Sequence, residues 1–223
     1  MMKRRIKREV ITKDPFKEKL VKKTSAAWRL RDKNTRFLFS AYTARERVVT
    51  HLFEEEKTKL PYPDGAVKEK NAEYAALLMP LFAGRNSEMS AFQQYLYQYW
   101  LTLDAYPELA LTLERMASEE DQHMRILGEL ITALGGEPIL RVGGRHGHGY
   151  YWTGEYVRQT RGVSDFLREN IAAEKNAIAE YNRRLKAIDD PYIRDVLARI
   201  MTDEQEHLRL LEAYEARIAS YGR

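Results

Sequence analysis

Residues 109–134 read LALTLERMASEEDQHMRILGELITAL, and apolar side chains recur along this stretch at alternating steps of four and three. Residues 193–218, IRDVLARIMTDEQEHLRLLEAYEARI, repeat the same spacing. This spacing is typical of the buried stripe of a bundle helix. Each stripe is interrupted by a glutamate and, three residues later, a histidine, namely Glu120 and His123, and Glu204 and His207. The pattern predicts two long helices that each point a carboxylate and an imidazole into a hydrophobic interior.

Such interruptions need a physical reason, because an unpaired ionised carboxylate inside a protein costs roughly several kcal/mol. Residues three apart lie on one face of a helix, about one turn from each other, so a glutamate and a histidine at this spacing reach one metal ion. One Glu-x-x-His alone is weak evidence. Two of them, both on core positions, indicate that the chain holds metal between helices.

The two halves of the chain match without gaps around these positions. Glu88 precedes Glu120 by 32 residues, and Glu174 precedes Glu204 by 30 residues. The segment EMSAFQQY that begins at Glu88 corresponds to EKNAIAEY, which begins at Glu174. We interpret the match as an internal duplication of about 50 residues per half.

Turn and cap signals divide the bundle into four helices. Pro107 suits a helix start, Gly135-Gly136 suits a helix end, and Ser164 is an expected N-cap. Pro80 predicts either a kink in the first helix or a separate turn before it. The fold class is therefore an all-α antiparallel four-helix bundle with one long crossover. The expected helices cover residues 71–102, 107–134, 164–188 and 191–218.

The first 60 residues differ in charge from the remainder. They hold 18 Lys and Arg against 8 Asp and Glu, a net charge of +10, whereas the remaining 19 basic and 25 acidic residues give −6. We assign residues 1–66 to a basic N-terminal extension, partly disordered or helical, and residues 67–223 to the bundle. The basic extension is expected to contact an anionic partner, or to be solvated or packed in an oligomer.

Four carboxylates and two imidazoles facing one interior are the ligand set of a two-metal carboxylate centre. Two divalent cations balance four carboxylates, and oxygen-rich ligands with two imidazoles favour iron or manganese. The alternative is a set of buried Glu–His hydrogen bonds without metal. Glu120 and Glu204 are the candidate bridging ligands, and Glu88 and Glu174 are the candidate terminal ligands. The complete predicted set is Glu88, Glu120, His123, Glu174, Glu204 and His207.

Three further residues lie near the predicted ligands in the sequence or on the same helical face. Tyr95 and Tyr181 each follow a predicted glutamate ligand by seven residues on the same helical face. Each is either a core tyrosine or a residue that hydrogen-bonds a carboxylate of the opposite pair or carries an electron. Glu119 is left out, because it lies about 100° around the helix from its neighbouring ligand.

The sequence resembles the ferritin-like di-metal carboxylate superfamily, on its rubrerythrin and bacterioferritin-like branch, over about residues 67–217. The resemblance is carried by RNSEMSAFQQYLY at residues 85–97, by the Glu-x-x-His pairs, and by the Gly-Gly stop. YWTGEY at residues 151–156 resembles proteins related to manganese catalases. The resemblance implies redox chemistry at a non-haem di-iron or di-manganese centre acting on peroxide or dioxygen, as in a rubrerythrin-like peroxidase.

The chain departs from that family in two places. Rubrerythrins often carry a rubredoxin-like Cys₄ iron site, but this chain has no cysteine, so a reductant would come from an external electron-donor protein. Many rubrerythrins also carry a second glutamate three residues after the ligand that corresponds to Glu174, where this chain has Ala177.

Three other functions remain open at this point. A ferroxidase or iron-handling protein would use ferrous iron as substrate, and a dimanganese catalase would disproportionate peroxide without a reductant. A non-enzymatic structural or binding protein would use its metals to hold the bundle together. We expect a cytoplasmic homodimer without a secretory signal or a transmembrane segment, since no apolar run of 18 residues occurs.

Overall fold

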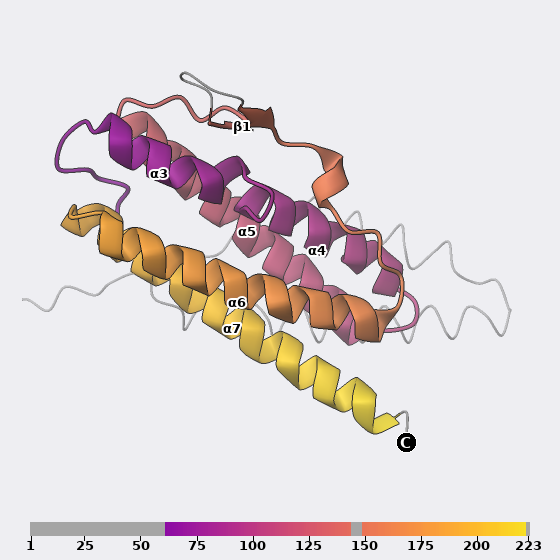
Figure 1. The fold of residues 1–223 in the computed structure, drawn as a ribbon. Coiled ribbons are helices and arrows are strands. Elements are labelled where there is room, and N and C mark those ends of the chain that lie inside the picture. Colours follow the sequence, from indigo (N-terminus) through magenta and orange to yellow (C-terminus); the bar gives the residue numbers. More distant parts are fainter. Residues whose placement is uncertain (1–60, 144–148, 222–223) are drawn as a thin grey trace, which may run out of the picture. The chain divides into compact units, whose positions relative to one another are not determined.

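The computed structural model describes residues 61–143 and 149–221, so the structure predicted for residues 1–60 lies outside it. Five α-helices account for most of this part (Figure 1). They are α3 (Ala72–Ala83), α4 (Glu88–Thr102), α5 (Pro107–Ala133), α6 (Val163–Ala187) and α7 (Pro191–Tyr221). Within the described residues, no helix combines the length and apolarity that crossing a membrane requires.

Two helical pairs form the bundle. Residues 103–106 connect α4 to α5, and residues 188–190 connect α6 to α7, so each pair is antiparallel and tightly packed. Figure 1 shows α6 and α7 running side by side, with α3 and α4 following each other along the opposite side of the bundle. The predicted ferritin-like bundle with one long crossover is confirmed.

The prediction of one helix over residues 71–102 is wrong, because this segment forms two helices, α3 and α4. Pro80 lies inside α3, and the break follows it at residues 84–87. Gly84 is extended, and its backbone N–H still donates to the Pro80 carbonyl at 3.1 Å. Ser87 then caps α4 by accepting from the Ser90 N–H, while the Ser90 hydroxyl donates to the Gly84 carbonyl at 3.2 Å. The new helix therefore begins at Glu88.

Local signals set the other helix ends. Gly135 adopts a left-handed φ of 83°, and the N–H of Gly136 donates to Ile131 at 2.8 Å, which ends α5 as predicted. Asp190 caps α7 by accepting from the N–H groups of Tyr192 and Ile193.

The predicted N-cap of the third helix is wrong. α6 begins at Val163 with Gly162 as its N-cap, so Ser164 lies in the first turn instead. There its hydroxyl accepts a hydrogen bond from Arg168 at 3.1 Å.

Two hydrophobic clusters fill the bundle. One joins α3 to the C-terminal part of α5 and the N-terminal part of α7, and includes Leu78, Leu130 and Ile200. The other joins the N-terminal part of α5 to α6 and the C-terminal part of α7, and includes Leu113 and Phe166. The predicted polar positions lie between them along each helix, so the candidate centre is enclosed by apolar packing at both ends.

The crossover, which joins α5 to α6, is attached to α4 by side-chain hydrogen bonds. Its strands β1 (Arg141–Val142) and β2 (Tyr150–Tyr151) pair antiparallel, and a short 3₁₀ turn, η1 (Gly154–Tyr156), follows. The Gln94 side chain exchanges two hydrogen bonds with the backbone of Arg158, at 2.6 and 2.9 Å. The Trp152 indole N–H donates to Ser90 at 2.9 Å.

The break in the first rod provides a stability test. A Cβ at Gly84 would lie 2.4 Å from the Pro80 carbonyl oxygen, closer than real contacts allow, whereas a Cβ at Gly154 would meet nothing within 4 Å. We expect Gly84→Ala to reduce the free energy of unfolding by about 1–3 kcal/mol. Gly154→Ala is the control and should leave it nearly unchanged. Chemical denaturation measures both, and equal midpoints for the two variants would contradict the steric explanation.

Candidate metal centre

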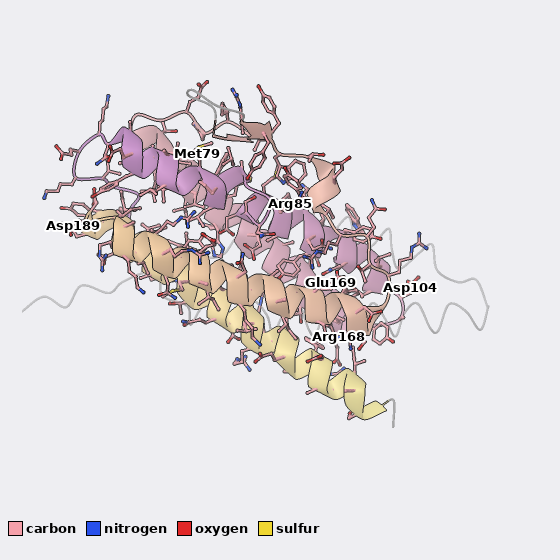
Figure 2. The ribbon with its side chains drawn as sticks, viewed as in Figure 1. Met79, Arg85, Asp104, Arg168, Glu169 and Asp189 are labelled. Atoms are coloured by element: carbon pink, nitrogen blue, oxygen red, sulfur yellow. The ribbon has the colours of Figure 1, made fainter. Side chains whose placement is uncertain are left out.

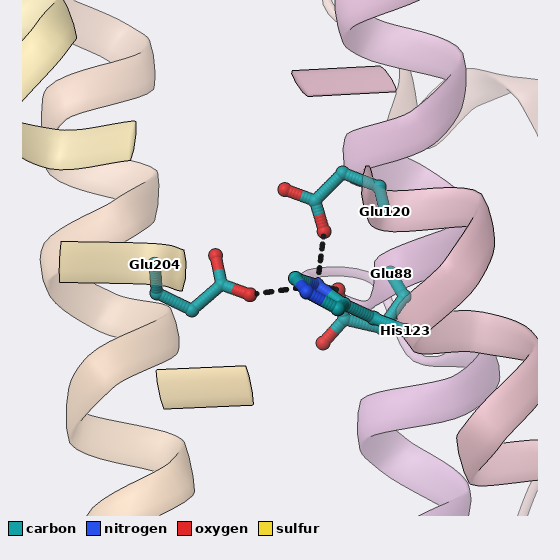
Figure 3. A group of neighbouring side chains, drawn as sticks. All are labelled: Glu88, Glu120, His123 and Glu204. Carbon is teal, nitrogen blue, oxygen red and sulfur yellow. Dashed lines mark hydrogen bonds and ion pairs between the residues drawn. The ribbon is translucent and has the colours of Figure 1, made fainter. Parts of the chain in front are cut away.

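The structure brings all six predicted ligands together from four helices. α4 contributes Glu88 and α6 contributes Glu174, while α5 and α7 each contribute a glutamate and a histidine. None of the six side chains belongs to a residue more than 5% exposed. They form two groups whose ligand atoms lie within 4.8 Å of one another (the first is drawn in Figure 3). The groups are Glu88, Glu120, His123 and Glu204, and Glu120, Glu174, Glu204 and His207.

The four glutamates differ in the number of ligand groups to which they belong. Glu120 and Glu204 belong to both groups, whereas Glu88 and Glu174 belong to one each. Carboxylates shared between two ions bridge them, and the others bind one ion each. This arrangement supports the bridging and terminal roles expected from the sequence, which stay a prediction.

Both imidazoles present the same ring nitrogen to the carboxylates. His123 Nδ1 lies 3.1 Å from Glu204 and 3.3 Å from Glu120. His207 Nδ1 lies 3.2 Å from Glu120 and 3.5 Å from Glu204. The Nε2 atoms face outward, so an Nε2–H tautomer would leave both Nδ1 lone pairs available for metal.

Each Nε2 atom faces a further carboxylate from the opposite half of the chain, and we call these two groups the outer carboxylates. His207 Nε2 lies 2.7 Å from Glu119, and His123 Nε2 lies 3.2 Å from Asp203. Arginines one turn earlier on the same helices approach these carboxylates, Arg199 at 2.6 Å from Asp203 and Arg115 at 3.9 Å from Glu119. A carboxylate behind a ligating histidine fixes the ring orientation and raises its basicity as a ligand.

Sequence reasoning missed the role of both outer carboxylates: Glu119, left out of the predicted ligand set, lies outside both ligand groups but contacts His207 from behind. A side chain 100° from the inner stripe still faces a neighbouring helix in a bundle, and Glu119 is only 9% exposed. The available signal was a longer repeat, Arg-x-x-x-acid-Glu-x-x-His. It begins at Arg115 in the first half and at Arg199 in the second.

Two tyrosines complete the cross-connections between the halves. The hydroxyl of Tyr95 on α4 donates to Glu174 on α6, and the hydroxyl of Tyr181 on α6 donates to Glu88 on α4. Both tyrosines are buried, with exposures of 2% and 0%. Burial, followed by the charge of the accepting carboxylate, raises the pKa of each hydroxyl well above its usual range. Both therefore remain protonated donors that orient the two candidate terminal ligands.

The direction of the pKa shift divides the four inner carboxylates into two kinds. Burial and then the charge of Glu120 raise the pKa of Glu88 well above its usual range. Burial and then the charge of Glu204 do the same to the pKa of Glu174. Burial also opposes ionisation of the two shared glutamates. There, hydrogen bonds from neighbouring side chains, including both imidazoles, outweigh it and lower both pKa values.

The imidazoles gain protons in this environment. Burial lowers the pKa of His123, but hydrogen bonds, that with Asp203 first, outweigh it and raise the pKa well above its usual range. Burial likewise lowers the pKa of His207, and hydrogen bonds led by that with Glu119 raise it. Without a cation, two imidazolium groups balance two ionised glutamates while the other two glutamates are protonated. Two divalent cations would balance the same site with all four carboxylates ionised.

The donor set fits such cations. Glu120 Oε1, Glu204 Oε1 and His207 Nδ1 are fully buried, and among the described residues they have ion-pair contacts at 3.1–3.2 Å but no hydrogen bond of acceptable geometry. Unsatisfied buried polar atoms are costly, and these atoms lie within the two ligand groups. A pair of bound cations would satisfy all three.

A cavity of about 80 Å³ reaches the centre from one side. Its inner wall includes Glu88 and Glu174, and its outer wall includes Arg85 and Glu169 (both labelled in Figure 2). Arg85 is exposed, so the cavity leads from solvent to the two candidate terminal ligands. Ala177, at the place of the second glutamate of many rubrerythrins, also lines it.

Comparison with known proteins identifies the family. The rubrerythrin family model matches residues 81–215. The chain belongs to the rubrerythrin family. The resemblance found in the sequence is thereby confirmed, and with it a family centre of two iron or manganese ions.

Two curated proteins are similar to this rubrerythrin-family chain. A probable manganese catalase from Clostridium acetobutylicum is 28% identical over 189 residues, which cover 77% of this chain and 83% of the catalase. A bacterioferritin from Desulfovibrio desulfuricans is 29% identical over 149 residues, which cover 66% of this chain and 79% of the bacterioferritin.

Solved structures agree with these sequence relatives. KatB, a manganese catalase from Anabaena PCC7120, superposes with a TM-score of 0.65 at 26% identity, covering 73% of this chain and 80% of KatB. The D. desulfuricans bacterioferritin, whose structure concerns a di-iron site in different catalytic states, gives a TM-score of 0.55 at 26% identity. That match covers 68% of this chain and 85% of the bacterioferritin.

The ligand groups predict how substitutions change metal content. Glu204 belongs to both groups and Glu88 to one. Glu204→Ala should therefore reduce the metal content from two ions to below one per chain, whereas Glu88→Ala should leave about one. Glu206→Ala is the control, because Glu206 pairs with Arg209 on the same helix outside both groups. Elemental analysis of folded variants tests this, and full occupancy in Glu204→Ala would remove Glu204 from the ligand set.

Metal binding should also release protons. Raised pKa values keep Glu88, Glu174, His123 and His207 protonated without metal, and each must lose a proton to act as a ligand. Loading two Mn²⁺ at neutral pH should release about four protons, so apparent affinity increases as pH rises. Calorimetry in buffers of different ionisation enthalpy measures the number. Release of no protons would contradict this account of the charge balance.

Proposed function

We propose that this protein degrades hydrogen peroxide at a dinuclear manganese or iron centre, by disproportionation that needs no external reductant. The observation that carries the proposal is the cavity that ends on Glu88 and Glu174. Structural metal sites are closed by protein ligands, whereas catalytic sites keep a side accessible to substrate. A cavity needs about 10–15 Å³ to hold one water, so 80 Å³ admits several molecules of that size.

The bound metal pair would supply the two-electron redox change that cleaves the O–O bond of one peroxide and oxidises a second. The protein residues have separate tasks. The two buried tyrosines hold Glu88 and Glu174 at the inner end of the cavity, and the outer carboxylates hold the imidazoles from behind. Two molecules of hydrogen peroxide give two of water and one of dioxygen, so electrons and protons balance without a further reactant.

Disproportionation needs no electron donor, whereas a peroxidase reaction of this cysteine-free chain would need an external donor protein. The similarity to manganese catalases, including coverage of 83% of the Clostridium protein, supports the same reaction.

The rubrerythrin family match favours a second candidate, the rubrerythrin-like peroxidase that the sequence first suggested. That reaction consumes two electrons and two protons per peroxide from an external donor protein.

Oxygen evolution separates the candidates. We expect the Mn²⁺-loaded protein to consume hydrogen peroxide without reductant and to release one O₂ per two peroxides. Cumene hydroperoxide, a bulky peroxide, should be consumed more slowly than hydrogen peroxide, because only small molecules reach the inner end of the cavity at Glu88 and Glu174. Glu204→Ala should abolish turnover, and Glu206→Ala should retain it.

The other outcomes are equally distinct. Peroxide loss that requires a reductant and releases no O₂ would replace disproportionation by the peroxidase reaction. Oxidation of added Fe²⁺ with mineral formation, without peroxide turnover, would indicate a ferroxidase. A fully loaded protein with none of these activities would overturn the proposal in favour of a structural metal site.

A further inference from the structure

One tyrosine outside the helices contacts the centre. Tyr62 lies in the segment before α3, within the part of the chain that the sequence assigned to the extension. Its hydroxyl lies 2.6 Å from Asp203 Oδ2 and 3.1 Å from His123 Nε2. Because a carboxylate oxygen accepts, the tyrosine hydroxyl is the donor to Asp203, and its own oxygen is left to accept from the imidazole.

The Tyr62 ring is fixed as well as its hydroxyl. It packs edge-on against His123, with ring centroids 5.9 Å apart, and the Arg199 guanidinium lies 4.4 Å from its centroid. Arg199 also donates to Asp203 Oδ2 at 2.6 Å. Tyr62, Arg199 and Asp203 therefore form one contact unit behind His123.

The segment that carries Tyr62 is attached to the bundle at two further points. The N–H of Lys68 donates to Asp190 at 2.7 Å, and the N–H of Asn71 donates to the Leu134 carbonyl at 3.1 Å. These attachments restrict where Tyr62 can lie. A side chain from outside the four rods is thus held against one imidazole of the centre.

We propose that Tyr62 is a positioning residue for His123 and selectively strengthens metal binding at the His123 position. Its hydroxyl orients the imidazole directly and through Asp203, so that Nδ1 points at the group formed with Glu88. Of the two imidazoles, Tyr62 contacts that of His123, whereas His207 Nε2 faces Glu119 on α5. The inference goes beyond the proposed reaction, since it concerns metal affinity and rests only on the ligand set.

The test isolates each metal position in the full-length chain. His207→Ala leaves the His123 position with its imidazole, and His123→Ala leaves the other. Tyr62→Phe keeps the ring and removes only the hydroxyl. In the His207→Ala background, Tyr62→Phe should weaken Mn²⁺ binding about 10-fold, the lower end of the range for partners behind a ligating histidine. In the His123→Ala background it should have no effect. Titration of the metal-free proteins, with free Mn²⁺ followed by electron paramagnetic resonance, measures both.

Two controls keep the result interpretable. Tyr214→Phe removes a partly buried hydroxyl that pairs with Thr112 at 2.9 Å, outside both ligand groups, and should change neither background. Asp203→Asn should weaken the His123 position as Tyr62→Phe does. Equal losses in both backgrounds, or no loss in either, would overturn the role of Tyr62. If neither histidine substitution changed Mn²⁺ binding, the ligand set itself would fail, whatever the result of the peroxide assay.

Discussion

Mutual repulsion among four buried carboxylates is the constraint on which the rest of this structure depends. Glu88, Glu120, Glu174 and Glu204 point into one interior, and burial alone opposes the ionisation of each. Four protons or two divalent cations neutralise the cluster equally well, so metal and protons compete for the same site. Hydrophobic clusters pack on either side of the carboxylates.

Each half of the duplicated sequence supports the ligands of the other half. Tyr95 from the first half holds Glu174 of the second, and Tyr181 returns the same bond to Glu88. The imidazoles follow the same rule through outer carboxylates on the opposite helix. A single half would present a glutamate and a Glu-x-x-His without any of these partners. The centre is therefore a property of the assembled bundle, and the internal repeat gives its two metal positions corresponding partners within the helices.

Helical periodicity explains what could be predicted from sequence. The alternating steps of four and three identify the inner face of α5 and α7, so interruptions such as Glu120 and His123 stand out as inward-facing polar groups. The same pattern continues across residues 84–87, because the break there lies in the extended backbone of Gly84 and the new N-cap at Ser87, which no periodicity records. The contact of Glu119 with His207 was missed because one helix has two neighbours in a bundle, and an inner stripe describes only one direction.

Tyr62 marks the limit of such reasoning. It lies 141 residues from Asp203 in sequence, in a segment without a helical repeat, so only the folded chain brings them together. The two sides of the centre also differ in what holds their ligands. The imidazoles are held from behind by charged carboxylates and arginines, whereas Glu88 and Glu174 face the cavity and are each held by a tyrosine hydroxyl.

This difference concerns what a small molecule meets at the centre. A hydrogen bond with an ionised partner is roughly twice as strong as one between neutral groups. The outer carboxylates therefore restrain the imidazoles firmly, and the tyrosine hydroxyls restrain Glu88 and Glu174 in the same way when these are ionised. The lining of the cavity includes all four inner glutamates and neither histidine. A small molecule that enters the cavity therefore meets carboxylates, while both imidazoles lie outside this lining with a carboxylate behind each of them.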